Sequence, residues 1–216
     1  MTMNTINHHL SDALLMAYSA GTLPEAFSLT VAAHISMCDE CRARLGAFDS
    51  VGGVLMAQGD TAEMAPGSLE ATLSRIMALK EVKQRSAPAH GVLPAPLQDY
   101  VGGDLDAAKW RPVGMGVKQA ILPTSRDATA RLLYIPAGAA VPDHGHRGTE
   151  LTLVLQGAFV DETDRFGPGD IEIAGEDVNH VPVADIGADC ICLAATDAPL
   201  RFKGLIPRLA QPFLRI

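Results

Sequence analysis

The chain has 216 residues, of which 48% are hydrophobic and 19% charged, so it can bury a core and is not broadly disordered. Its 25 acidic and 17 basic residues give a formal net charge of -8, which argues against direct binding to nucleic acid or an anionic membrane. No stretch approaches the roughly 18 consecutive apolar residues of a membrane helix. No basic residue precedes Arg42, so the charged start of a signal peptide is missing. We therefore expect a cytoplasmic protein of one or two domains.

The first part of the chain is expected to be helical, with helices beginning near Asp12, Pro24, Asp39 and Ser68. Ser11 is a plausible N-cap of the first helix, and Gly21 is its plausible end. Gly52-Gly53 should weaken the third helix late in its course. The fourth helix carries an apolar stripe at helical spacing, formed by Leu69, Leu73, Ile76 and Met77.

The second part of the chain is expected to form strands. Short runs rich in Val, Ile and Leu are separated roughly every 8 to 12 residues by Gly, Pro or Asp, which predicts an antiparallel sandwich or barrel. Residues 86–96 hold three prolines and read as a linker. We therefore predict an α+β multidomain chain, with an all-α domain over residues 1–85 and an all-β domain over residues 97–216. Few contacts should cross the linker, so that each side folds alone.

Metal-ligand chemistry is indicated first by His34, Cys38 and Cys41. Offsets of four and three residues place the three side chains on one face of a helix, and two thiolates with one imidazole suit Zn²⁺. A closed site needs a fourth ligand, and His8 and His9 are the only other candidates in this half. Two alternatives stay open. The cysteines could be a redox pair, although such pairs normally follow a strand of a βαβ unit, or they could simply pack in a core.

A second candidate site combines three imidazoles and one carboxylate: His144, His146, Glu150 and His180. His144 and His146 lie two residues apart, so on a strand they point to the same side. Such a set, converging inside a barrel, would bind Zn²⁺ or another divalent transition metal. The alternative is a pair of solvated loop histidines followed by an exposed strand start.

Two further cysteines, Cys190 and Cys192, lie on an expected strand and face the same way. They are interpreted either as small buried hydrophobic residues or as a redox-sensitive pair near the metal.

Both ligand sets resemble known families. The stretch from Gly138 to Gly157 resembles the first cupin motif, and Pro168-Gly169-Asp170 with His180 resembles the second. The His34-x3-Cys38-x2-Cys41 pattern resembles the zinc-binding anti-sigma domain, in which an upstream histidine is the fourth ligand; His9 matches that position best. In this order and at this length, the two together resemble ChrR-type anti-sigma factors over essentially the whole chain.

The resemblance implies an inhibitor and not an enzyme. In that family the helical domain binds an extracytoplasmic-function (ECF) sigma factor, here expected one to one, and keeps it from RNA polymerase. The cupin domain is needed for reactive oxygen, such as singlet oxygen, to release it. An acidic helical module suits a basic DNA-binding partner. The stripe on the fourth helix could pack on that partner as a helix in a groove, or merely on its own domain.

The alternative function is a metal-dependent cupin enzyme of the dioxygenase, isomerase or decarboxylase class, with a helical regulatory appendage. No obvious additional acid, base or arginine clamp marks a substrate pocket, although Tyr134, Asp143 and Arg147 stay candidates. A metal-storage or metal-sensing protein is a third interpretation.

Overall fold

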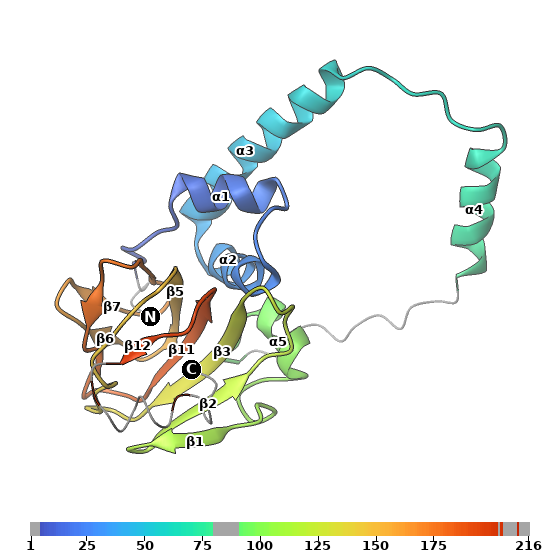
Figure 1. Ribbon diagram of the computed structural model, residues 1–216. Helices are drawn as coiled ribbons and strands as arrows, with labels where there is room; N and C mark the ends of the chain where they lie inside the picture. The colour runs from blue at the N-terminus through green and yellow to red at the C-terminus, as the bar shows by residue number, and fades with distance from the viewer. Residues whose placement is uncertain (1–4, 80–90, 203, 205–210, 212–216) are drawn as a thin grey trace.

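The computed structural model describes residues 5–79, 91–202, 204 and 211. In Figure 1 the helices belong to the N-terminal part of the chain and the strands to the C-terminal part. The helices are α1 (Asp12–Ser19), α2 (Glu25–Met37), α3 (Asp39–Gln58), α4 (Ser68–Ala78) and α5 (Ala95–Val101). Among the described residues, no helix is both long and apolar enough to cross a membrane.

The helix ends follow local chemistry. Ser11 caps α1 as predicted, since its side chain accepts the Leu14 N–H at 3.3 Å, and Gly21 follows the helix with a φ of +67°. Gly52-Gly53 does not end α3, which continues to Gln58. α4 begins at Ser68, as expected; its N-cap is Gly67, and the Ser68 hydroxyl donates to the Ala65 carbonyl at 2.6 Å.

The strands pair antiparallel in three sheets. The large sheet has the order β1-β2-β3-β11-β5-β8, and two small sheets have the orders β10-β6-β7 and β12-β4-β9. The long strands are β1 (Arg111–Gly114), β2 (Val117–Ile121), β3 (Thr129–Ile135), β5 (Glu150–Gln156), β8 (Ile171–Ala174) and β11 (Cys190–Thr196). The short strands are β4 (His144–Gly145), β6 (Phe159–Val160), β7 (Arg165–Phe166), β9 (Asn179–His180), β10 (Val183–Ala184) and β12 (Arg201–Phe202).

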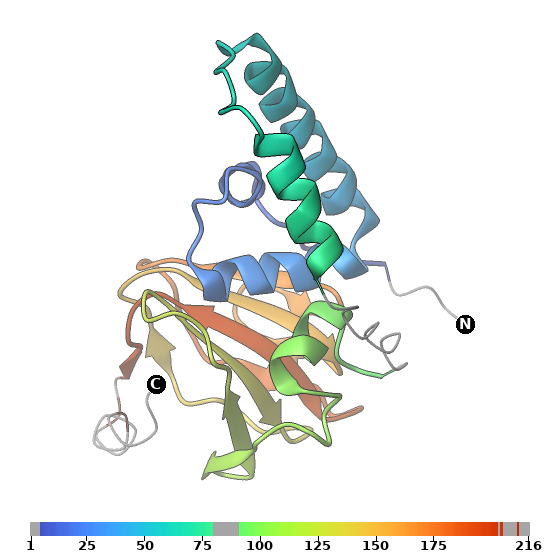
Figure 2. The same ribbon diagram turned by 90° about the vertical axis from the view of Figure 1, so that its right-hand side faces the viewer.

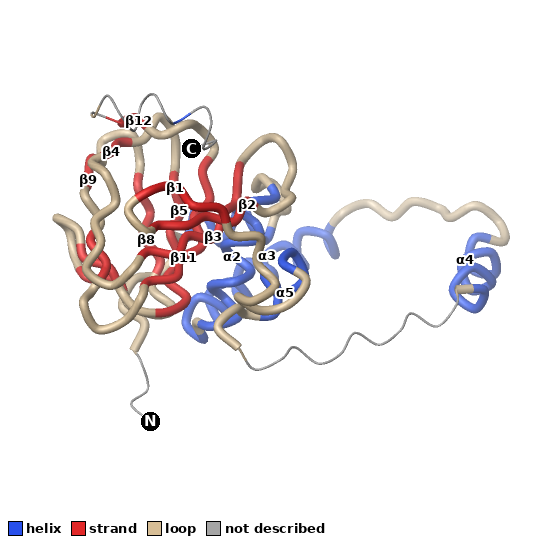
Figure 3. Tube along the Cα trace, turned by 90° about the horizontal axis from the view of Figure 1, so that it is seen from below, coloured by secondary structure: helices blue, strands red, loops and turns tan. Residues whose placement is uncertain are grey.

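The predicted α+β class with an antiparallel all-β part is confirmed, but over the described residues the sheets do not close into one barrel. Each strand of the two small sheets is only two residues long, so hydrogen bonding does not continue from sheet to sheet around the domain. Figure 3 shows β4, β9 and β12 together at one edge of the β domain, away from the helices.

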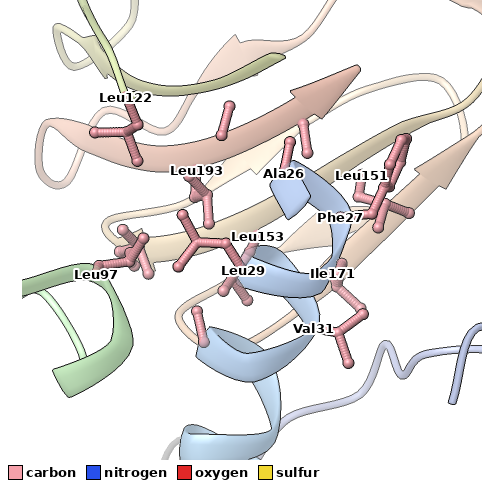
Figure 4. Close-up of a cluster of buried hydrophobic side chains, with 14 of the residues drawn as sticks. Ala26, Phe27, Leu29, Val31, Leu97, Leu122, Leu151, Leu153, Ile171 and Leu193 are labelled. Atoms are coloured by element: carbon pink, nitrogen blue, oxygen red, sulfur yellow. The ribbon is translucent and has the colours of Figure 1, made fainter. Parts of the chain in front are cut away.

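Helix α2 lies across one face of the large sheet (Figure 2). Leu29 belongs to the same buried cluster as Leu153 and Leu193 of the sheet, and Figure 4 shows these side chains meeting. At the start of α2, Glu25 accepts hydrogen bonds from the Tyr100 hydroxyl at 2.7 Å and the Ser125 N–H at 2.6 Å. The expectation that few contacts join the two parts is therefore wrong, because this face of the sheet is apolar and α2 shields it from water.

The end of the predicted linker also packs. The N–H groups of Val92 and Leu93 donate to the Asp104 carboxylate at 3.1 and 2.8 Å, and the Leu93 side chain is buried. α5 begins at Ala95. Residues 80–90 lie outside the described residues, so the boundary at residue 85 stays a prediction.

The far half of α3 and all of α4, which we call the arm (residues 51–79), stand away from the rest of the molecule (Figure 1). No residue of α4 is buried. The alternative that the α4 stripe packs on its own domain is therefore wrong. The large apolar side chains exposed on the arm are Val51, Val54, Leu55, Met56, Met64, Leu69, Leu73, Ile76, Met77 and Leu79.

Candidate metal centres

The first candidate centre joins the N-terminal segment to the junction of α2 and α3. Ligand atoms of His9, His34, Cys38 and Cys41 all lie within 4.8 Å of one another, as the sequence predicted. Nδ1 of His9 is 3.3 Å from the Cys38 sulfur and 3.7 Å from that of Cys41. Two sulfur and two nitrogen atoms at these separations fit the tetrahedral ligand set of structural zinc.

The buried state of His34 supports a metal in this position. Its side chain is fully buried, and neither ring nitrogen makes a hydrogen bond with the described residues. An unpaired buried polar group is unfavourable unless something else binds it. Burial lowers the pKa of His34 to about 4, so at neutral pH its imidazole is uncharged and has a lone pair to offer.

The structure distinguishes His8 from His9 as candidates for the fourth ligand. His9 turns Nδ1 toward the two thiols, while its Nε2 lies 3.3 Å from a carboxylate oxygen of Glu40. Such a carboxylate fixes the tautomer and the ring orientation of a metal-ligating histidine. His8 points elsewhere, with its ring centroid 4.3 Å from that of Phe166.

Zinc binding at this centre is expected to strengthen as pH rises. Burial raises the pKa of the Cys41 thiol to about 11, so this thiol must lose a proton when it binds metal, whereas His34 is already neutral. Both thiols bind as thiolates, and each proton released on binding makes binding tighter by up to about tenfold per pH unit, so we expect a rise of up to about a hundredfold. Zinc competition titrations at pH 6.5 and 7.5 measure this slope, and an affinity independent of pH would contradict it.

The second candidate centre lies where β4 pairs with β9 and brings His144 opposite His180. Nε2 of His180 lies 3.2 Å from Nε2 of His144 and 3.3 Å from Nε2 of His146. All three side chains are buried, and burial lowers the pKa of both His144 and His146. Imidazole nitrogens facing one another at this distance share a proton or a cation, and three buried histidines that converge in this way fit a metal ligand set.

Outer hydrogen bonds hold two of these rings so that Nε2 faces the centre. Nδ1 of His144 donates to the Pro142 carbonyl at 2.9 Å. Nδ1 of His180 lies 2.9 Å from Glu172 and 3.0 Å from Asp161. Burial alone would lower the pKa of His180, but these two carboxylates outweigh it and raise the pKa to about 9.

Glu150, the predicted fourth ligand, lies beside this centre and not within it. One of its oxygens accepts the Thr152 hydroxyl at 3.0 Å, and the other is 3.8 Å from Nδ1 of His146. Its role as a ligand stays a prediction. The sequence analysis missed Asp161 and Glu172, which together with His180 form a further group of possible ligands.

A cavity of about 290 Å³ opens beside the histidines. Most of its lining is apolar, and it includes Phe159 and Phe202 besides His144 and His180. Cys192 also reaches the cavity wall, with its sulfur 3.4 Å from that of Cys190. Both thiols are buried, and the contact with Cys190 together with burial raises the pKa of Cys192 well above the usual range, so Cys192 is protonated at neutral pH.

Comparison with known proteins decides the family. A family model described as the ChrR cupin-like domain matches residues 98–198. The anti-sigma-E factor ChrR of Cereibacter sphaeroides is 62% identical over 215 residues, which cover 98% of this chain and 100% of the relative. The chain belongs to the ChrR family of anti-sigma factors.

A solved structure agrees with this assignment to the ChrR family. The crystal structure of Rhodobacter sphaeroides SigE in complex with the anti-sigma ChrR contains a chain that is 61% identical, with a TM-score of 0.80. The match covers 89% of this chain and 100% of that chain. The predicted resemblance is thus confirmed, and with it the expectation of a regulator in place of a cupin enzyme.

Proposed function

We propose that this chain binds an ECF-type sigma factor one to one, keeps it from RNA polymerase, and releases it when reactive oxygen acts on the cupin domain. The observation that carries the proposal is the 62% identity to an anti-sigma factor over 98% of the chain. The solved relative is in complex with SigE. Binding to a component of the transcription machinery supports a cytoplasmic location and needs no direct contact with nucleic acid or membrane.

The arm is proposed as the sigma-binding surface, with Leu69, Leu73, Ile76 and Met77 as contact residues. An apolar stripe exposed along one helix is a typical anchor for a partner's groove. The net charge of -8 favours a basic partner.

Co-purification tests the function. The tagged full chain should retain the sigma factor of its native host in a one-to-one ratio, and absence of any sigma factor would contradict the proposal. Met77→Asp should reduce the retained amount by at least about tenfold, because a charge in an apolar groove lacks a partner. Ile186→Asp is the matched control: Met77 is 85% and Ile186 is 87% exposed, but Ile186 lies in the β domain. Equal loss from both variants would exclude the arm as the contact surface.

Both candidate centres are proposed to bind metal. Zn²⁺ fits His9, His34, Cys38 and Cys41, and its role there is to hold the N-terminal segment, α2 and α3 together. In the cupin domain, His144, His146 and His180, with Glu150 beside them, suit Zn²⁺ or another divalent transition metal.

The cupin centre should be dispensable for inhibition but needed for response. We expect His144→Ala, His146→Ala and Glu150→Ala to keep the sigma factor bound while blunting its release under oxidative stress. These side chains lie in the β domain, remote in sequence from the arm. Transcription from a sigma-dependent promoter, with and without a singlet-oxygen source, measures both effects. Variants that fail to inhibit in unstressed cells would contradict this division of labour.

A further inference from the structure

The hairpin of β6 and β7 (residues 159–166) contacts His180 of the cupin cluster and His8, the sequence neighbour of His9 in the Cys₂His₂ cluster. At one position Oδ2 of Asp161 lies 3.0 Å from Nδ1 of His180, in the cupin cluster. Three residues later, Oδ2 of Asp164 lies 3.2 Å from Nε2 of His8. The ring of Phe166 also packs on His8, and His8 directly precedes His9 of the Cys₂His₂ cluster. A short piece of chain thus connects the two clusters.

The Asp161 carboxylate contacts both the cupin cluster and the bend that leads to Asp164. While Oδ2 of Asp161 faces His180, Oδ1 accepts the Thr163 N–H at 2.8 Å, the Thr163 hydroxyl at 2.6 Å and the Asp164 N–H at 3.1 Å. These hydrogen bonds define the bend that presents Asp164 to His8. A reorientation of Asp161 at the cupin cluster must therefore shift Asp164 as well.

The turn that follows the hairpin fixes the same N-terminal segment. Oδ1 of buried Asp170 accepts the N–H groups of Asn7 at 2.6 Å and His8 at 2.9 Å, while Oδ2 accepts the Gly167 N–H at 2.8 Å. Gly169 has a φ of +92°, and a Cβ there would come within 2.5 Å of Ile6. The turn is therefore shaped to receive this segment.

The described residues that precede α1 form no helix or strand of their own. His9 itself faces the two thiols and Glu40, and the contacts of His8 with the hairpin and the turn add to its placement. We propose that this hairpin is the mechanical link through which the cupin cluster controls the position of His9 in the anti-sigma zinc centre, with Asp161, Asp164 and Asp170 as positioning residues. The inference rests on the proposed function, since it supplies the route by which the cupin domain opens the sigma-binding half. When His180 shifts, Asp161 and Asp164 move with it, the hairpin displaces the segment at His8, and His9 is drawn away from the two thiols.

Amide hydrogen exchange in the full chain, without sigma factor or oxidant, tests the link. The readout is the exchange rate of Asn7 and His8, whose N–H groups are bound by Asp170. Asp161→Asn keeps one oxygen for the Thr163 bend and removes the carboxylate charge facing His180. We expect it to speed exchange at Asn7 and His8 about tenfold, the size of the free energy lost with the charge-assisted hydrogen bond between Asp161 and His180. Asp170→Asn sets the upper limit, because it disrupts the anchor itself.

The matched control is Asp185→Asn. Asp185 pairs with Arg165 of the same hairpin at 2.8 Å but contacts neither cluster, so exchange at Asn7 and His8 should stay at the wild-type rate. Wild-type exchange in Asp161→Asn, with faster exchange in Asp170→Asn, would overturn the proposal.

If Asp161→Asn does not fold, Asp164→Asn decides, because the Asp164 side chain is 64% exposed and its replacement leaves the core intact. It should also speed exchange at His8, and unchanged exchange there would overturn the link. No sigma factor or oxidant enters the measurement, so its failure is distinct from a failure of the proposed function, which co-purification tests.

Discussion

Cys38→Ser is expected to abolish sigma-factor binding and to remove one of two metal equivalents from the chain. The Cys38 sulfur belongs to the Cys₂His₂ cluster and also accepts the Cys41 N–H at 3.4 Å at the start of α3. A structural zinc ion contributes about 10–16 kcal/mol to the folding of small zinc domains, which exceeds the whole stability of many domains. Without it, the N-terminal segment, α2 and α3 lose their shared anchor, and the arm that continues α3 is no longer held in place.

Elemental analysis and co-purification measure the two effects. Cys190→Ser is a suitable control, since Cys190 is also buried but lies on β11, outside both clusters. It should retain two metals and the sigma factor. A single metal equivalent in the wild-type chain, unaffected by Cys38→Ser, would contradict the zinc centre.

A fragment of residues 1–85 is expected to inhibit its sigma factor both with and without oxidant. The fragment keeps all four proposed zinc ligands and the whole arm, so it keeps the binding surface. It lacks the hairpin, the Asp170 turn and the cupin cluster, so nothing remains to move His9 in response to stress. Transcription from the target promoter, with the full chain as control, separates the two properties. Unaltered transcription in both conditions would exclude the helical part as the inhibitor.

The same fragment should be less stable than the full chain. It exposes the face of α2 that packs on the large sheet, where Leu29 contacts the cluster of Leu153 and Leu193. Burial of one such side chain contributes about 1.5–3 kcal/mol. Leu29→Gln in the fragment should raise its solubility without changing inhibition, whereas in the full chain it should lower the free energy of unfolding. Thermal unfolding of the fragment and the full chain, each with and without Leu29→Gln, measures the stabilities, and the soluble yield and the promoter assay of the two fragments measure the rest.

The sequence pointed to His34, Cys38, Cys41, His144 and His146 as candidate ligands because their spacing is local. Cys38 and Cys41 lie one helical turn apart, and His144 and His146 lie two residues apart, so short-range geometry already places them together. The outer carboxylates could not be found in this way. Asp170 binds Asn7 across 163 residues, and Asp161 meets His180 by a side-chain contact between segments of two different sheets, so both depend on tertiary structure.

The docking of α2 on the sheet left a signal that the sequence analysis did not use. Most of the helix is buried, on several sides at once, including Phe27, Leu29, Val31 and His34. A helix that is apolar all round is a buried helix and not a surface one. Apolar residues on several sides of α2 therefore indicate that this helix is covered all round. They do not indicate that a sheet covers one of its faces.

The exposed arm bears on how long the unbound protein lasts in a cell. Ten large apolar side chains stand in water on residues 51–79, and α4 buries none of its own residues. Exposed apolar segments without a packed partner attract chaperones and the proteases that act with them. We therefore expect free chains to be degraded faster than bound ones, so that the amount of inhibitor follows the amount of its partner. A pulse-chase measurement with and without co-expressed sigma factor would show this as a longer half-life of the chain when the partner is present.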